Sequence, residues 1–132
     1  MNFEDPKNIE RSDQLSYRII GAAMEVHRHL GPGLLKSAYD ECLCHELKLQ
    51  GIPFERQKPL PVNYKGVQLD CGYKLNTLVD KLVILEVMAV EEIAPIHDAQ
   101  LLTYLKLSDL WLGLLINFNV EVLKDGIHRM VN

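Results

Sequence analysis

The 132-residue chain lacks the features of secreted, membrane and disulfide-rich proteins. Its three cysteines, Cys42, Cys44 and Cys71, form no disulfide framework, and their odd number predicts reduced thiols in the cytoplasm. The longest apolar runs, within Leu82–Val90 and Leu110–Ile116, are too short to cross a bilayer. The polar, acidic N-terminus has the composition of neither a signal peptide nor a transit peptide. We therefore expect a soluble cytoplasmic protein without a membrane partner.

The chain also lacks an excess of positive charge and the usual catalytic motifs. A net charge of −4 and a pI near 5.7 predict weak nucleic-acid binding or none, although a local basic patch stays open. Its five histidines lack HExxH-type metal spacing, so we expect them at the surface or in helix caps. The segment "GPGLL" has neither the GxxxxGK pattern nor a preceding strand, which excludes a phosphate-binding loop.

What the chain does contain is a pattern of apolar residues typical of an α+β domain. Hydrophobic residues make up 48% and charged residues 24%, which fits a globular protein. We expect a flexible N-terminal segment over residues 1–11 and a single domain over residues 12–132. The predicted order is α-α-β-β-β-β-α-β-β, with a mixed central sheet flanked by helices.

The boundaries of these elements follow from capping residues, glycines and changes of period. The first helix is capped by Ser12 or Asp13 and ends at the "GPG" of residues 31–33, and the second ends near Gly51. The predicted strands are Phe54–Lys58, Leu60–Tyr64, Val67–Val79, Leu82–Val90, Leu110–Val120 and Gly126–Val131, with a helix at Pro95–Leu107 before the last two.

One carboxylate, Glu86, interrupts the apolar strand "LVILEVMAV". Burying a carboxylate without a partner is costly, so Glu86 belongs to a site or reaches solvent at the strand end. Alternate residues share a face of a strand, which puts Glu86 with Met88. A three-residue loop at Asp80–Leu82 would place Asn76 opposite Glu86 and on the same face, whereas a two-residue loop would turn Asn76 to the other face.

Five segments carry a resemblance to a known family: "IIGAAMEVHRHLGPGLL", "AYDECLCHELKLQG", "ERQKPLPVNYKG", "HDAQLLTYLKLS" and "LGLLINFNVEVLKDGIHRMVN". Through them, nearly the whole chain resembles the bacterial and archaeal GxxExxY family, which is assigned to the PD-(D/E)xK nuclease-like superfamily. The resemblance implies a restriction-endonuclease-like core. It also implies a site in which carboxylates hold a divalent cation against a phosphodiester, beside a lysine.

Three positions of that implied site differ from the family pattern. The GxxExxY motif falls on Gly33, Lys36 and Tyr39, so lysine replaces the helix glutamate. The strand aspartate falls on Asn76, and the lysine of the E-x-K motif is replaced by Met88. Asparagine offers a metal only a neutral oxygen, methionine carries no charge, and a lysine near the cation would repel it.

Two positions keep the residue type that the resemblance implies, namely Glu86 and Gln100. We expect Glu86 to be the remnant of a metal site, with at most weak metal binding, neutralised by an ion pair with Lys36. The alternative is a glutamate that simply reaches solvent.

The resemblance and its departures predict a catalytically degenerate protein that acts by binding or self-association and needs no cofactor. The alternative is a nuclease that uses Mg²⁺ or Mn²⁺, with Lys36 substituting for the lost strand lysine. The segment "LWLGLLINFNV" fits either a strand edge in a homo-oligomer or a central buried strand. The sequence identifies no other partner.

Overall fold

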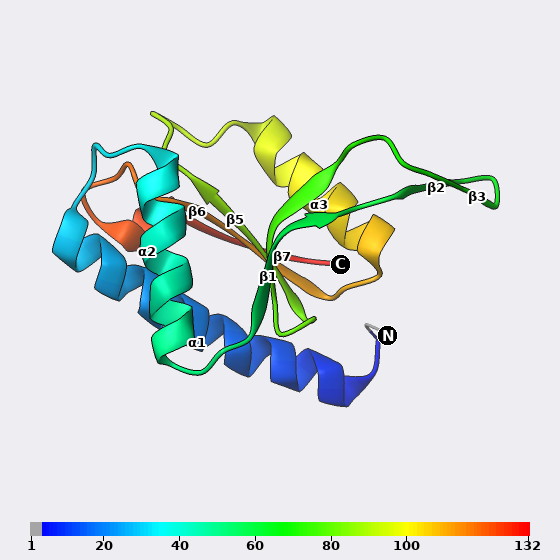
Figure 1. Cartoon of the computed structure of the whole chain (residues 1–132), viewed down its shortest axis with the longest axis horizontal. Helices are drawn as coiled ribbons and strands as arrows, with labels where there is room; N and C mark the ends of the chain where they lie inside the picture. The colour runs from blue at the N-terminus through cyan, green and yellow to red at the C-terminus, as the bar shows by residue number, and fades with distance from the viewer. Residues whose placement is uncertain (1–3) are drawn as a thin grey trace.

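A computed structural model describes residues 4–132, which form three layers: a mixed sheet in the middle and helices on each of its faces (Figure 1). The helices are α1 (Pro6–Leu30), α2 (Lys36–Leu49) and α3 (Pro95–Ser108). The strands of the main sheet are β1 (Phe54–Pro59), β4 (Lys74–Val79), β5 (Val83–Met88), β6 (Leu112–Asn117) and β7 (Ile127–Val131). Strands β2 (Val62–Tyr64) and β3 (Val67–Leu69) form a separate hairpin that extends away from the body, and the short 3-10 helix η1 (Leu123–Gly126) precedes β7.

Strand β5 occupies the middle of the sheet, whose order is β1-β4-β5-β6-β7. Strands β5 and β6 are parallel and are connected through α3, whereas the other neighbouring pairs are antiparallel. This arrangement confirms the predicted α+β class with a mixed central sheet. It also explains the apolar segment around β6, because every residue of that strand is buried between two neighbours.

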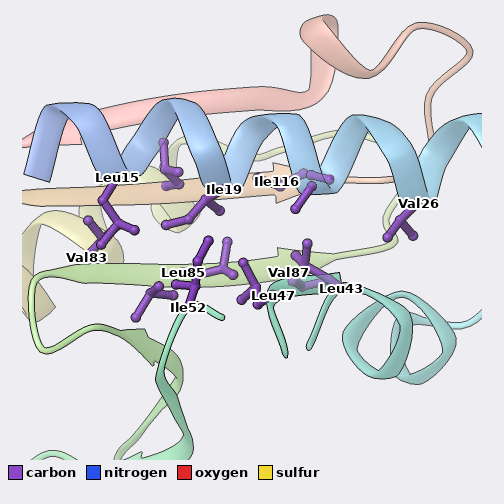
Figure 2. Packing of buried hydrophobic residues seen from close by; sticks show 14 of the residues in the cluster. Leu15, Ile19, Val26, Leu43, Leu47, Ile52, Val83, Leu85, Val87 and Ile116 are labelled. Carbon is purple, nitrogen blue, oxygen red and sulfur yellow. The ribbon is translucent and has the colours of Figure 1, made fainter. Parts of the chain in front are cut away.

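Two apolar clusters hold the helices on the sheet. On one face, α1 and α2 pack Leu15, Ile19 and Leu47 against alternate residues of β5, including Leu85 and Val87 (Figure 2). On the other face, α3 packs Leu101 and Leu105 against Ile84 and Leu115. The period-2 pattern of β5 therefore divides its side chains between two cores, and only Glu86 interrupts the second set.

Helix α1 begins earlier than predicted. Asp5, not Ser12 or Asp13, caps it by accepting a hydrogen bond from the Lys7 amide at 2.9 Å, and Pro6 supplies the fixed backbone angle of a first helical residue. The serine at the predicted cap is instead buried within the helix. The predicted flexible segment over residues 1–11 therefore overlaps α1 from Pro6 onward, while residues 1–3 lie outside the described part of the chain.

The long strand predicted over Val67–Val79 is divided in two. Gly72, with φ of 78°, turns the chain between β3 and β4, and its N–H donates to the Asp70 carboxylate at 3.0 Å. An aspartate two residues before a glycine is a typical turn signal, which the apolar pattern alone concealed. The predicted helix at Pro95–Leu107 is confirmed as α3, and no helix within residues 4–132 is long and apolar enough to cross a membrane.

Close packing of α3 on β6 depends on Gly113. A Cβ atom at this position would lie 2.8 Å from the Leu101 Cδ1 atom. We expect Gly113→Ala to lower the free energy of unfolding by about 1–3 kcal/mol, because the added methyl group overpacks this core. Urea denaturation measures the effect.

The matched control is Gly21→Ala on the exposed face of α1, where an added Cβ meets no atom within 4 Å. This change should stabilise the protein by about 0.5–1 kcal/mol through helix propensity. Equal stability changes for the two variants would contradict the packing that we describe.

Candidate functional site

A cavity of about 300 Å³ lies at the C-terminal end of β5, between the start of α2 and the outer side of α3. Its lining combines the end of β5 with residues from both helices: Lys36, Glu86, Val87, Met88, Ala89, Val90, His97, Gln100, Leu101, Tyr104 and Leu115. Four residues singled out in the sequence, Lys36, Glu86, Met88 and Gln100, therefore line one cavity. Asn76 is not among its described lining residues.

The register between β4 and β5 decides how Asn76 meets Glu86. Val79 pairs with Val83, so the connecting loop has three residues, which is the first of the two loops considered. Continuing this register puts Asn76 across from Glu86, and the Asn76 N–H donates to the Glu86 Oε1 atom at 3.2 Å. The carboxylate of Glu86 therefore caps a backbone amide of the neighbouring strand.

The side chain of Asn76 is buried and turns toward α2. Its Oδ1 atom accepts from the Val87 N–H at 2.8 Å, and its Nδ2 atom donates to the Asp40 Oδ1 atom at 3.1 Å. The Glu86 carboxylate thus contacts the Asn76 backbone N–H, whereas the Asn76 side chain does not lie beside that of Glu86 as expected. In the ladder between β1 and β4, Gln57 and Asn76 are not paired, and Gln57 has a φ of 53°. This local kink leaves the Asn76 backbone N–H available to Glu86.

Lys36 pairs with Asp40 and not with Glu86. Its Nζ atom lies 3.7 Å from the Asp40 Oδ2 atom, and about half of the lysine side chain is exposed. Within residues 4–132 no ion pair joins Lys36 to Glu86, so the predicted ion pair is wrong. Residues four apart on a helix lie next to each other, so the ammonium of Lys36 pairs with Asp40 on the same helix and not with Glu86 on the strand.

Asp40 is the residue that the sequence interpretation missed. It is buried on α2, and its carboxylate lies between the Asn76 amide and the Lys36 ammonium. Its spacing of four residues from Lys36 was the available signal. Burial of this carboxylate is tolerable because both oxygens have partners, which spares the cost of an isolated buried charge.

Burial raises the pKa of Glu86 from its ordinary 4.5 to about 7. The nearby Asp40 carboxylate contributes to this rise, and the hydrogen bond from Asn76 and the positive charge of Lys36 limit it. The environment of this strand thus favours the protonated, neutral form of a carboxyl group that the sequence alone would leave charged.

Helix α3 contributes three polar side chains to the cavity wall. His97 accepts a hydrogen bond from the Ala94 N–H through its Nδ1 atom at 3.0 Å and so caps the start of α3, one of the two roles expected for the histidines as a group. Gln100 and Tyr104 follow at helical spacing and line the same wall. Burial and the negative charge of Glu86 raise the pKa of the Tyr104 hydroxyl, so it remains a neutral donor.

The GPG turn fixes where α2 begins and hence where Lys36 and Asp40 lie. The Tyr39 hydroxyl donates to the Gly31 carbonyl at 2.6 Å and accepts from the Leu34 N–H at 3.1 Å. Its ring stacks on Phe118 with centroids 4.7 Å apart. Gly33, at φ 97°, adopts a conformation that other residues avoid. Tyr39 and Gly33 thus position the start of α2 and do not themselves line the cavity.

The described acidic residues do not assemble a metal centre. Residues 4–132 contain no group of three or more His, Cys, Asp or Glu side chains that could hold a metal ion. Of the two carboxylates near the cavity, that of Asp40 is already bound to an amide and paired with an ammonium. This donor set does not fit Mg²⁺, which relies on anionic oxygen ligands to offset its dehydration.

The fold is consistent with a nuclease-like α+β domain, and a family comparison agrees. The model of the PD-(D/E)XK nuclease superfamily matches residues 13–130, and the chain belongs to this superfamily. No curated protein and no solved structure is similar enough to the chain to count as a match.

The raised pKa of Glu86 makes a prediction about stability. The folded state binds this proton more tightly than the unfolded state, so the stability contribution is full below pH 4.5 and is lost as pH rises toward 7. The Glu86→Gln variant keeps an acceptor for the Asn76 N–H but cannot ionise. Above pH 7 it should be more stable than the wild type by up to about 3 kcal/mol, and near pH 4.5 the advantage should disappear.

Denaturant titrations at several pH values measure this difference. The control is Glu121→Gln at an exposed position, which should not change the pH dependence. A constant difference between Glu86→Gln and the wild type from pH 4.5 to pH 8 would contradict the raised pKa.

Proposed function

We propose that this chain is a catalytically degenerate nuclease-fold protein of the GxxExxY family that acts by binding. The observation that carries the proposal is that the side-chain amide of Asn76 is hydrogen-bonded within the protein. Its oxygen accepts from the Val87 N–H, and its nitrogen donates to the Asp40 carboxylate. The position where the superfamily pattern has a metal-binding aspartate therefore serves the fold.

An aspartate would fit poorly at position 76 in this arrangement. It would bring a carboxylate within hydrogen-bond distance of the Asp40 carboxylate, and two like charges so close repel unless a cation or proton intervenes. Asparagine removes the repulsion and donates a hydrogen bond instead. The replacement of Asp by Asn is therefore consistent with a site that is stable without a cation.

The other two replacements support the same proposal. Lys36 adds a positive charge next to Asp40, where the pattern has a glutamate. Met88 packs against the apolar cluster under α3, where the pattern has a lysine that faces the substrate. Each change is explained by a site that no longer balances a metal and a phosphate.

A metal-dependent nuclease is the second candidate, and Asp40 favours it. This residue provides a second carboxylate beside Lys36, with Glu86 and Gln100 along the same cavity region. If the Asp40 side chain rotated away from Asn76, two carboxylates and a lysine could meet a cation. We rank this function second because the rotation would leave the buried Asn76 amide without that partner.

Self-association has support from the hairpin. The hairpin projects from the body of the molecule (Figure 1), and its strands carry the exposed apolar residues Tyr64, Val67 and Leu69. The apolar segment around β6 gives no support, because its burial within the sheet accounts for it.

The metal-binding prediction compares three proteins. The wild type and Met88→Lys should give no heat of binding with Mn²⁺ or Mg²⁺ in calorimetry and should not nick plasmid DNA. The combined variant Lys36→Glu, Asn76→Asp, Met88→Lys restores two carboxylates and the lysine. It should bind Mn²⁺ at least about tenfold more tightly than the wild type, which is about 1.4 kcal/mol.

Met88→Lys is the matched control because it adds charge to the cavity without adding a metal ligand. Wild-type protein that binds Mn²⁺ as tightly as the folded combined variant, or that nicks DNA, would favour the second candidate. Circular dichroism must confirm that the combined variant is folded before an absence of metal binding by that variant is interpreted.

A further inference from the structure

The cavity beside Glu86 shares a wall with a second, more apolar hollow. The second hollow has a volume of about 460 Å³ and lies between α3 and the base of the hairpin, where Val62 and Tyr73 line it. Gln100 and Tyr104 line both hollows, so α3 forms their common border. Together they offer a site whose inner end is polar and whose outer end is apolar.

The charges at the inner end disfavour a charged ligand. Lys36 lines this cavity and its ammonium is paired with Asp40, so a cation would meet that ammonium and an anion would meet the Asp40 carboxylate beside it. Most of the remaining wall is apolar and includes Met88, Val90 and Leu101. A neutral ligand avoids both repulsions and gains from burial against these side chains.

The neutral polar groups of α3 fit a ligand edge that both donates and accepts hydrogen bonds. The Gln100 amide and the Tyr104 hydroxyl can each do both. The Nδ1 atom of His97 is occupied by the Ala94 N–H, so the neutral ring carries its proton on Nε2 and is a donor. Such a mixed edge is characteristic of amide-like and heteroaromatic molecules.

Aromatic side chains at the border favour a flat ligand. The rings of Tyr73 and Tyr104 are tilted by 57° with centroids 6.3 Å apart, and Tyr73 is about half exposed. A planar ring can stack on tyrosine and bury both of its faces, and hollows of this volume hold small ligands.

We propose that this cavity binds a neutral, planar heteroaromatic molecule of the nucleobase type, with its polar edge toward Gln100 and its ring against Tyr104. The proposal rests on the proposed function, because it requires a cavity in which no metal ion competes for Glu86. It adds a ligand class that the loss of catalysis alone does not imply.

The test is an NMR titration of the ¹⁵N-labelled chain in EDTA with adenosine, guanosine, cytidine and uridine as probes. At least one nucleoside should shift the amide resonances of Val90, Gln100 and Tyr104 in a saturable manner. The corresponding 5′-monophosphate should bind no more than about twofold more tightly, because the Lys36 ammonium is already paired with Asp40.

Two variants and two controls assign the binding to the cavity. Gln100→Ala and Tyr104→Leu should each weaken nucleoside binding at least about fivefold, as expected for a lost hydrogen-bonding edge or stacking face. Gln14→Ala and Tyr17→Leu change the same residue types at exposed positions of α1 and should leave the affinity unchanged.

A short single-stranded oligonucleotide of the preferred base distinguishes the two possible sources of the bound ring, a free small molecule and a base within a nucleic-acid strand. Equal affinity for nucleoside and strand supports a free small molecule, whereas tighter binding of the strand that Tyr104→Leu abolishes supports an unpaired base. The proposal is overturned if no nucleoside binds, or if inorganic phosphate alone competes with the monophosphate. If the protein bound neither a nucleoside nor a metal ion, only this inference would be overturned. Metal binding would overturn the proposed function.

Discussion

The side-chain amide of Asn76 joins the three elements on which the site depends. From β4 it reaches the backbone of β5 through the Val87 N–H and reaches α2 through the Asp40 carboxylate. These bonds lie in a buried region, where an unsatisfied polar group costs about 1–3 kcal/mol. Beside the apolar contacts of Leu43 and Leu47, this amide gives α2 a buried polar link to the sheet near Lys36 and the cavity.

The backbone N–H of the same residue gives a physical account of the glutamate within an apolar strand. Glu86 is held by the Asn76 backbone N–H, with its remaining oxygen surface toward the cavity. Because the neighbouring lysine is engaged by Asp40, the strand cannot rely on a direct ion pair. A proton takes that role near neutral pH, as the raised pKa of this carboxyl group indicates. The cavity is thereby close to neutral without a metal ion.

Much of the fold was predictable because it follows from short-range patterns. The nearly continuous run of apolar residues in β5 required burial on both faces, which is met because helices cover both faces of the sheet. The register that puts Asn76 across from Glu86 followed from loop length. The start of α1 was missed because Asp5 and Pro6 precede the apolar pattern from which the helix was predicted.

The details of the site were less predictable because they depend on side-chain competition. The family resemblance placed Lys36 beside Glu86, whereas in the packed structure its partner is Asp40, one helical turn away. The direction of the Asn76 side chain depends on its partners on other elements, Asp40 on α2 and the Val87 N–H on β5, which the local sequence around residue 76 does not identify. Superfamily membership is shown by the family match over residues 13–130, whereas the loss of the metal site is our proposal.

The central claim is that a proton, and not a metal ion, balances the charge of Glu86. A ¹³C NMR titration of the Glu86 side-chain carboxyl group, with and without saturating Mg²⁺, tests it directly. The account predicts an apparent pKa of about 7 that Mg²⁺ leaves unchanged. A pKa that falls toward 4.5 when Mg²⁺ is added would mean that the cation displaces the proton, and it would contradict the account.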